Sequence, residues 1–233
     1  MFLVGAGPGA PDLITLRGAD VLSRADVVIY DNLVSPELMQ LAPPEAELIY
    51  AGKRGGSEKA IEQRELNAML IEQGRKGRVV VRLKGGDPFI FGRGGEEAEA
   101  LSTAKIPFEV VPGVTSAIAG PAFAGVPLTH REHGSFVAFV TGHEVERKDA
   151  PSVPWEELAA AAKRGGTIVI LMATARMGAT LERIRAAGLP SETPAVAVHW
   201  ATTAAQKTVS TTLATLAEES ARAGIGAPAV IVV

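Results

Sequence analysis

Short apolar runs alternate with segments of helical periodicity along the first half of the chain. The runs are rich in Val, Ile and Leu and are bounded by Gly, Pro or polar residues, so we predict strands at 2–4, 27–30, 47–50 and 79–81. Apolar positions recur with helical spacing from Leu13 to Leu22, and a more polar helix is expected from about Ala60 to Gln73. Alternating strands and helices are typical of a parallel sheet.

The second half alternates in the same way after a break. A strand at Val110–Val111 ends in Pro112-Gly113, and the segment 114–125 that follows is rich in Ala and Gly, which we interpret as the passage between two lobes. Beyond it we expect strands at 136–140, 167–172, 195–199 and 229–233 and helices at 155–164 and 177–187. The pattern predicts an α/β fold of two lobes, residues 1–112 and 113–233, with more antiparallel pairing in the second.

Composition narrows the class of protein. Of the 233 residues, 47% are hydrophobic and 21% are charged, which favours a compact globular fold over a disordered chain. The absence of cysteine excludes disulfides, zinc-thiolate sites and cysteine nucleophiles. A net charge of −3 argues against a general nucleic-acid surface, and no apolar run is long enough to span a membrane. Because the chain starts without a signal-peptide pattern, we expect a cytoplasmic protein.

A glycine-rich turn follows the first strand, and its residues allow two interpretations. The spacing fits the dinucleotide-binding pattern G-x-G-x-x-G/A, with Gly5, Gly7 and Ala10. Pro8 and Pro11 restrict the backbone, however, and helical periodicity resumes only at Leu13, so no helix N-terminus lies where a pyrophosphate would need it. The glycines could equally close a tight connection between strand and helix.

Asp31 ends the second predicted strand, and it too has two interpretations. A carboxylate at the carboxyl end of a parallel strand lies where open α/β sheets bind their ligands. Asp followed by Asn32 is also an ordinary turn former, so spacing alone leaves both roles open.

The stretch from Val81 to Glu97 carries the most chemistry. A buried strand runs into Gly85-Gly86-Asp87-Pro88, then into a second glycine-rich turn with Arg93, and then into a helix whose first turn holds two glutamates. Paired glycines let the backbone approach a ligand closely, and the carboxylate of Asp87 can accept hydrogen bonds from a ribose or an amino group. Turn formation can explain each glycine by itself. It does not explain why the glycines alternate with cations and with the apolar run 89–91.

This stretch resembles the glycine-aspartate-proline signature of the uroporphyrinogen-III C-methyltransferases and, more loosely, that of the related precorrin methyltransferases. The resemblance runs from residue 2 to 233 and is densest between 79 and 143, with further matches at 4–9, 28–31, 52–54, 111–116, 125–131 and 140–143. It implies the tetrapyrrole methylase fold, which is not a Rossmann methyltransferase fold. It also implies a homodimer and a cleft between two α/β lobes that binds S-adenosylmethionine.

The resemblance assigns roles to individual residues. Asp31 matches the position of a proton acceptor, and Lys53 matches that of a proton donor. The positions matching cofactor contacts are Pro8, Gly85, Gly86, Asp87, Ile90, Thr115, Ser116, Met172 and, through its backbone, Ala201. S-Adenosylhomocysteine would be the product derived from the cofactor.

The implied reaction transfers two methyl groups to C2 and C7 of uroporphyrinogen III, which gives precorrin-2 by way of precorrin-1 for sirohaem or cobalamin biosynthesis. A sulfonium methyl is already activated, so the protein mainly has to align the reactants, and no metal is required. The tetrapyrrole carries eight carboxylates. The cations expected to contact them lie in or beside glycine-rich turns and are Arg17, Arg54, Arg93, His130, Arg131 and His143.

Some segments depart from the family pattern. The loop 55–62 lacks the histidine and proline that commonly follow Gly-Lys-Arg, which leaves substrate contacts in that loop open. Ala173 stands where glycine is usual, and His199-Trp200-Ala201 stands where an acid, an asparagine and a glycine are common. His130 and His133 have a spacing that suits a metal on a helix, but their neighbours are typical of a loop and no third ligand matches, so no metal is expected.

Three other functions have to be separated from this one. A methyltransferase for a later precorrin would share the fold and differ in substrate. An NAD-dependent oxidoreductase would use the turn at Gly5 together with Asp31, but it leaves the stretch 81–97 unexplained. A non-catalytic tetrapyrrole carrier would not need the cofactor positions.

Overall fold

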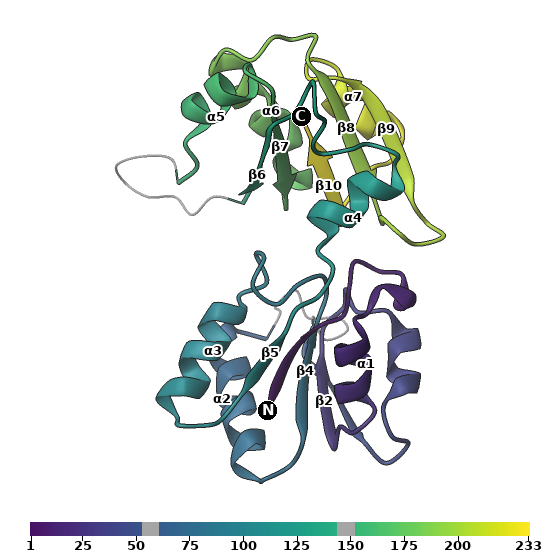
Figure 1. The fold of residues 1–233 in the computed structure, drawn as a ribbon, viewed down its shortest axis with the longest axis vertical. Coiled ribbons are helices and arrows are strands. Elements are labelled where there is room, and N and C mark those ends of the chain that lie inside the picture. Colours follow the sequence, from purple (N-terminus) through teal and green to yellow (C-terminus); the bar gives the residue numbers. More distant parts are fainter. Residues whose placement is uncertain (53–60, 144–151) are drawn as a thin grey trace. The chain divides into compact units, whose positions relative to one another are not determined.

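The computed structural model describes residues 1–52, 61–143 and 152–233 (Figure 1). The chain divides into two compact units, Met1–Thr115 and Ser116–Val233, and each unit has its own five-stranded sheet. The lobe boundary predicted after residue 112 stays a prediction. Within the part of the chain that the structure describes, no helix has both the length and the apolar character needed to cross a membrane.

The first unit is built on a parallel sheet, as the sequence pattern predicts. Its strands follow the order β3-β2-β4-β1-β5, and every neighbouring pair is parallel. The strands are β1 (Phe2–Gly5), β2 (Val27–Tyr30), β3 (Glu47–Tyr50), β4 (Val80–Lys84) and β5 (Glu109–Val111). Because parallel strands end at one edge of the sheet, the turns that follow β1, β2, β4 and β5 gather at that edge.

Helices cover both faces of this sheet (Figure 1). They are α1 (Leu16–Leu22), α2 (Gln63–Arg75) and α3 (Gly94–Thr103). Val21 and Leu22 of α1 belong to the core on one face, whereas Leu70 of α2 and Leu101 of α3 belong to the core on the other. The position of β4 at the centre of the sheet therefore buries it from both sides, and all five of its residues are buried.

The first helix begins later than its periodicity predicts. Residues Pro11–Leu13 form a 3-10 turn, and a second one spans Pro36–Leu41. The α-helix starts at Leu16 because Thr15 is its N-cap, with a side-chain oxygen that accepts a hydrogen bond from the N–H of Gly18 at 3.0 Å. The cap, rather than the apolar pattern, sets where this helix begins.

The second unit has a mixed sheet, again as predicted. Its strand order is β6-β7-β10-β8-β9; β6 and β7 are parallel, and the remaining pairs are antiparallel. The strands are β6 (Phe136–Thr141), β7 (Gly166–Leu171), β8 (Pro194–His199), β9 (Lys207–Thr212) and β10 (Ala229–Val232). The helices are α4 (Ser116–Phe123), α5 (Trp155–Ala162), α6 (Met177–Ala186) and α7 (Leu216–Arg222), with a 3-10 turn at Thr174–Arg176.

Three elements of the second unit were not predicted. The small-residue segment after Thr115 forms α4, whose Gly120 packs against Ala201 and Val230, with ordinary van der Waals space for an added Cβ. The many small residues of this helix hide its period. The strand β9 was missed because it is rich in Thr and Ser and only partly buried, and the helix α7 because its seven residues are too few for a clear helical period.

Candidate functional site

Three glycines meet at the carboxyl edge of the first sheet, where the turns after β1, β4 and β5 converge. A Cβ on Gly5 would lie 2.6 Å from the N of Gly113 and 2.7 Å from the carbonyl oxygen of Gly86. Gly7 adds a pair of backbone hydrogen bonds to Gly86, with N···O distances of 3.2 and 2.6 Å. We call Gly5, Gly86 and Gly113 the glycine junction. Because an added Cβ would overlap backbone atoms at Gly5 and Gly113, and Gly86 has a left-handed φ of 68°, each of the three positions favours glycine.

Asp87 ties the junction together. Its Oδ2 accepts a hydrogen bond from the N–H of Gly113 at 3.0 Å, and its Oδ1 accepts one from the N–H of Phe89 at 2.8 Å. Asp87 therefore has a structural role, and its predicted role, accepting hydrogen bonds from a ligand, stays a prediction. Each carboxylate oxygen retains a further lone pair for a ligand.

Asp31 lies beside this group at the end of β2. Its Oδ1 accepts a hydrogen bond from the N–H of Leu33 at 3.0 Å, and a Cβ on Gly85 would come within 2.7 Å of the Cβ of Leu33. The turn that carries Asp31 therefore packs directly on the Gly85-Gly86 turn. The side chain of Asp31 is 23% exposed, so its carboxylate is within reach of a ligand.

A buried charged network underlies both turns. Arg82 and Lys84 point from β4 to the same face, and both donate to Oε1 of Glu97 in α3, at 3.2 Å from Nε and 2.8 Å from Nζ. Arg82 also reaches Oδ2 of Asp31 at 3.4 Å through a terminal nitrogen. Burial, and then the charge of Arg82, lower the pKa of Lys84, while Glu97 and Asp31 act in the opposite direction.

The loop between β4 and α3 exposes its apolar residues. Phe89, Ile90 and Phe91 are 54%, 38% and 40% exposed, and Phe91 and Arg93 have left-handed φ values of 52° and 57°. Left-handed non-glycine residues cost free energy, and they cluster at functional sites. Arg93 pairs with Glu96 at 2.8 Å, and its side chain is 57% exposed.

In the second unit, the predicted cofactor positions also lie next to left-handed residues. Met172 follows β7 with a φ of 59° and is 48% exposed, and Ala201 is buried between Trp200 and Thr202, which have φ values of 43° and 69°. Ser116 is the first residue of α4. Three such residues in two short turns indicate that the surrounding structure enforces these conformations.

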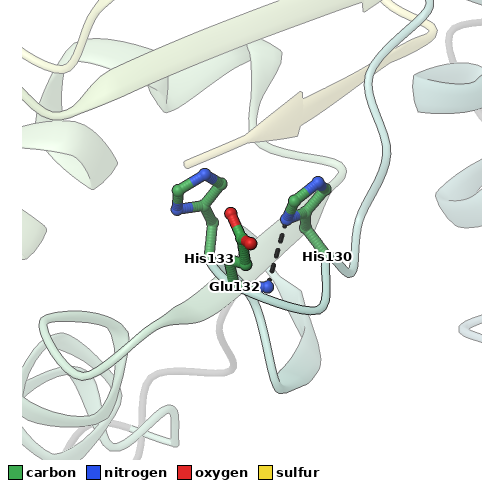
Figure 2. Close-up of side chains that lie close together, drawn as sticks. All are labelled: His130, Glu132 and His133. Atoms are coloured by element: carbon green, nitrogen blue, oxygen red, sulfur yellow. Dashed lines mark hydrogen bonds between the residues drawn. The ribbon is translucent and has the colours of Figure 1, made fainter.

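His130, Glu132 and His133 form an exposed cluster in the turn before β6 (Figure 2). The two rings are stacked with centroids 4.8 Å apart, and Nδ1 of His130 accepts a hydrogen bond from the N–H of Glu132 at 3.2 Å. The turn is closed by paired backbone hydrogen bonds between His130 and Gly134. In the tautomer that this hydrogen bond assigns, Nε2 of His130 carries the proton and offers a donor to solvent.

The structure places the remaining predicted residues as follows. Arg17 lies at the start of α1 and forms two hydrogen bonds with Glu109 at 3.1 and 3.0 Å, and a third with Asp20. These contacts hold its guanidinium at the amino end of β5, away from the carboxyl edge of the sheet. Arg131 and His143 are exposed, and Pro8 is partly buried in the turn after β1. Lys53 and Arg54 lie outside the described residues.

Sequence reasoning assigned no role to Arg82 or Glu97. The sequence did contain a sign of this network, because two cations in an otherwise apolar strand require a buried counterion. Which acid supplies it could not be deduced from spacing, since both Glu96 and Glu97 begin α3. The structure shows that Glu96 is exposed and Glu97 is completely buried.

Comparisons with known proteins identify the family. The model of the family described as tetrapyrrole (corrin/porphyrin) methylases matches residues 1–217. An S-adenosyl-L-methionine-dependent uroporphyrinogen III methyltransferase of Methanosarcina barkeri is 46% identical over 233 residues, which cover 100% of this chain and 90% of that protein.

Two solved methyltransferase structures are similar to this chain over nearly its whole length. The uroporphyrin-III C-methyltransferase of Thermus thermophilus, complexed with S-adenosylhomocysteine, has a TM-score of 0.81 and 37% identity, and covers 99% of this chain and 95% of that one. A cobalt precorrin-4 methyltransferase of cobalamin biosynthesis has a TM-score of 0.83 and 32% identity, and covers 99% of this chain and 92% of that one.

Proposed function

Because this chain belongs to the family of tetrapyrrole (corrin/porphyrin) methylases, we propose that it transfers methyl groups from S-adenosylmethionine to carbon atoms of uroporphyrinogen III. The observation that carries the proposal is the glycine junction with Asp87 fixed beside it. A relative that is 46% identical over the whole chain bears this activity in its name, and a structural neighbour holds the demethylated cofactor. The products are S-adenosylhomocysteine and precorrin-2, formed by way of precorrin-1 after methylation at C2 and C7.

Of the residues proposed to bind the cofactor, Ile90 and Met172 are exposed, Thr115 and Ala201 are buried, and the others are partly buried. In the first unit the proposed residues are Pro8, Gly85, Gly86, Asp87, Ile90 and Thr115, and in the second they are Ser116, Met172 and Ala201. The residues present suit such a ligand, since Ile90 and Met172 offer exposed apolar surface. The free oxygen lone pairs of Asp87 can accept hydrogen bonds from hydroxyl or amino groups.

When bound, the cofactor supplies an activated methyl group, so the protein's contribution is mainly orientation. The pyrrole carbon forms a bond to the methyl carbon as the methyl–sulfur bond breaks, and a proton must then leave the ring system. Asp31 is the proposed acceptor of that proton, because its carboxylate is partly exposed and fixed beside the Gly85-Gly86 turn. Lys53 is the proposed proton donor.

The carboxylates of the tetrapyrrole need cationic or hydrogen-bond donors. Arg93, Arg131, His130 and His143 are exposed and fit this role, and Arg54 is included from its place in the sequence. The Nε2–H of His130 is a donor that suits a carboxylate. Arg17 is left out of the proposal, because its pair with Glu109 holds the guanidinium at the amino end of β5, away from the carboxyl edge of the sheet. A cytoplasmic homodimer stays a prediction.

The direct test is an anaerobic incubation of the purified protein with uroporphyrinogen III and S-adenosylmethionine, followed by mass analysis of the tetrapyrrole. A gain of two methyl groups supports the proposal. Cofactor binding without methyl transfer would favour a later precorrin as substrate, for which the likeness to the cobalt precorrin-4 methyltransferase is the specific indication. If calorimetry detected no cofactor binding, the methyltransferase function would be wrong.

A further inference from the structure

We propose that Arg82 and Glu97 are positioning residues that hold the Asp31 carboxylate in the orientation needed to accept a proton. This inference rests on the proposed function, in which Asp31 is the proton acceptor. It assigns a role to a charged network that is buried except at Asp31 and that lies outside the glycine junction.

The network is a continuous chain of contacts from α3 to the site. Glu97, with a fully buried side chain, accepts from Arg82 at 3.2 Å, and Arg82 reaches Asp31 at 3.4 Å. The side chains become more exposed along this path, from 0% at Glu97 to 5% at Arg82 and 23% at Asp31. The network therefore starts in the core and ends at a carboxylate that a ligand can touch.

The guanidinium of Arg82 is held by acceptors on several sides. Its Nε donates to Glu97, one terminal nitrogen donates to the carbonyl oxygens of Ile29 and Leu83 at 3.4 and 3.1 Å, and the other faces Asp31. Because a guanidinium is planar and rigid, fixing three of its donors fixes the direction of the fourth. Lysine has one point charge on a flexible stem and could not satisfy Glu97 and direct a donor at Asp31 together.

The Asp31 carboxylate is consequently held at both oxygens. Oδ1 accepts from the N–H of Leu33 at 3.0 Å, and Oδ2 faces Arg82. These two contacts set the rotation of the carboxylate plane, so the remaining lone pairs point in a defined direction. For a reaction limited by alignment, a defined acceptor direction contributes to kcat rather than to substrate affinity.

Burying so many charges needs a reason beyond stability. A buried ion pair is often no more stabilising than apolar residues of similar volume, because desolvation offsets the attraction. Oε2 of Glu97 is buried and has no hydrogen-bond partner among the described residues, which adds to this cost. Lys84 completes the charge balance, since it donates to the same Glu97 oxygen at 2.8 Å. Two cations and two carboxylates, Asp31 included, leave the network without net charge.

The test is a double-mutant cycle between Arg82→Lys and Asp31→Asn in the full chain. Arg82→Lys keeps the charge beside Glu97 and removes the directed donor. We expect kcat for methyl transfer to fall by about tenfold to a hundredfold, while KM for both substrates and the affinity for S-adenosylhomocysteine change by less than about twofold. In the Asp31→Asn background, the same substitution should have almost no further effect on kcat, because the residue it positions is absent.

A second variant guards against loss of folding. Arg82→Met combined with Glu97→Gln removes one charge of each sign, so the net charge of the network is kept, and the amide oxygen introduced at position 97 can still accept the hydrogen bond of Lys84. The kcat of this double variant should fall by the same factor as that of Arg82→Lys. Arg24→Lys is the matched control, because Arg24 pairs with Asp20 on the exposed surface of α1, and its kcat should equal that of the unmodified protein.

The possible failures are distinguishable. If Arg82→Lys lowers kcat by the same factor with and without Asp31→Asn, the positioning role is wrong and Asp31 keeps its proposed role. An Arg82→Lys variant with normal kcat overturns the positioning role as well. If Asp31→Asn alone retains kcat, then Asp31 is not the proton acceptor and the inference falls with it, although the methyl transfer itself stands.

Discussion

The N–H of Gly113 donates a hydrogen bond to Oδ2 of Asp87 at 3.0 Å, which joins the segment leaving β5 to the turn that follows β4. The two residues are 26 positions apart in sequence. A Cβ on Gly113 would overlap the carbonyl oxygen of Gly86, so the hydrogen bond and the close backbone packing depend on one another. This pairing makes Asp87 a part of the frame of the site as well as a candidate ligand contact.

Replacing Asp87 by alanine should therefore weaken cofactor binding in two ways. It removes a candidate hydrogen-bond acceptor for the ligand, and it leaves the N–H groups of Gly113 and Phe89 without their acceptor. We expect the dissociation constant for S-adenosylhomocysteine, measured by calorimetry, to rise by about 5-fold to 150-fold, on the order of 1–3 kcal/mol. Asp87→Asn retains one acceptor oxygen, so its dissociation constant should lie between those of the unmodified protein and Asp87→Ala. An unchanged dissociation constant in Asp87→Ala would remove Asp87 from the cofactor site.

The glycine junction predicts a large difference between two glycine substitutions. Gly113→Ala introduces a Cβ that overlaps the backbone of Gly86 and Gly5, so we expect a loss of roughly 1–3 kcal/mol in the free energy of unfolding. Gly95→Ala is the matched control, because Gly95 lies in α3 with no atom within 4 Å of an added Cβ. Alanine there should stabilise the helix by about 0.5–1 kcal/mol. Denaturant unfolding measures both, and equal effects would contradict the packing described.

More of the fold than of the site could be predicted from the sequence. The strands of the first sheet are apolar runs with clear boundaries, so their number and parallel pairing follow from the sequence. In contrast, α4 and β9 have no strong period, because α4 is built from small residues and β9 is mostly hydroxylated. At the site, the motif identified Asp87 and Gly86 as special but could not show that Gly5 and Gly113 meet there. That contact joins three strands and depends on their register.

Acid should destabilise the protein through paired surface carboxylates. A hydrogen bond from Arg17 is the largest cause that lowers the pKa of Glu109, and Lys76 and Arg93 lower the pKa values of Glu72 and Glu96 in the same way. A carboxyl whose pKa is lower in the folded state contributes stability above its unfolded pKa and loses it as the pH falls through the folded value. The melting temperature should therefore fall as the pH drops below about 4.3, the ordinary pKa of glutamate.

The variant Glu109→Gln isolates one of these pairs. It keeps the size of the side chain and removes the charge, so it should melt lower than the unmodified protein at neutral pH, and the difference should shrink as the pH falls through the folded pKa of Glu109. Glu37→Gln is the control, because Glu37 is exposed and has no ion pair among the described residues. A constant difference at every pH would mean that the Arg17 pair does not stabilise the fold.

Asp31→Asn separates catalysis from binding. The amide keeps the shape of the carboxylate and an oxygen for the N–H of Leu33, but it is not a base. We expect kcat for methyl transfer to fall by about a hundredfold or more, with the dissociation constant for S-adenosylhomocysteine changed by less than about twofold. Single-turnover kinetics with a binding titration measure both quantities. Loss of cofactor binding together with activity would assign Asp31 a binding role instead.

The central claim is that uroporphyrinogen III receives methyl groups on carbon. The most direct measurement uses S-adenosylmethionine labelled with ¹³C in its methyl group, incubated anaerobically with the protein and uroporphyrinogen III, and ¹³C NMR of the tetrapyrrole product. We predict two labelled methyl resonances, both on ring carbons and assigned to C2 and C7. Label at any other position, or none in the tetrapyrrole while the cofactor remains bound, would contradict the account.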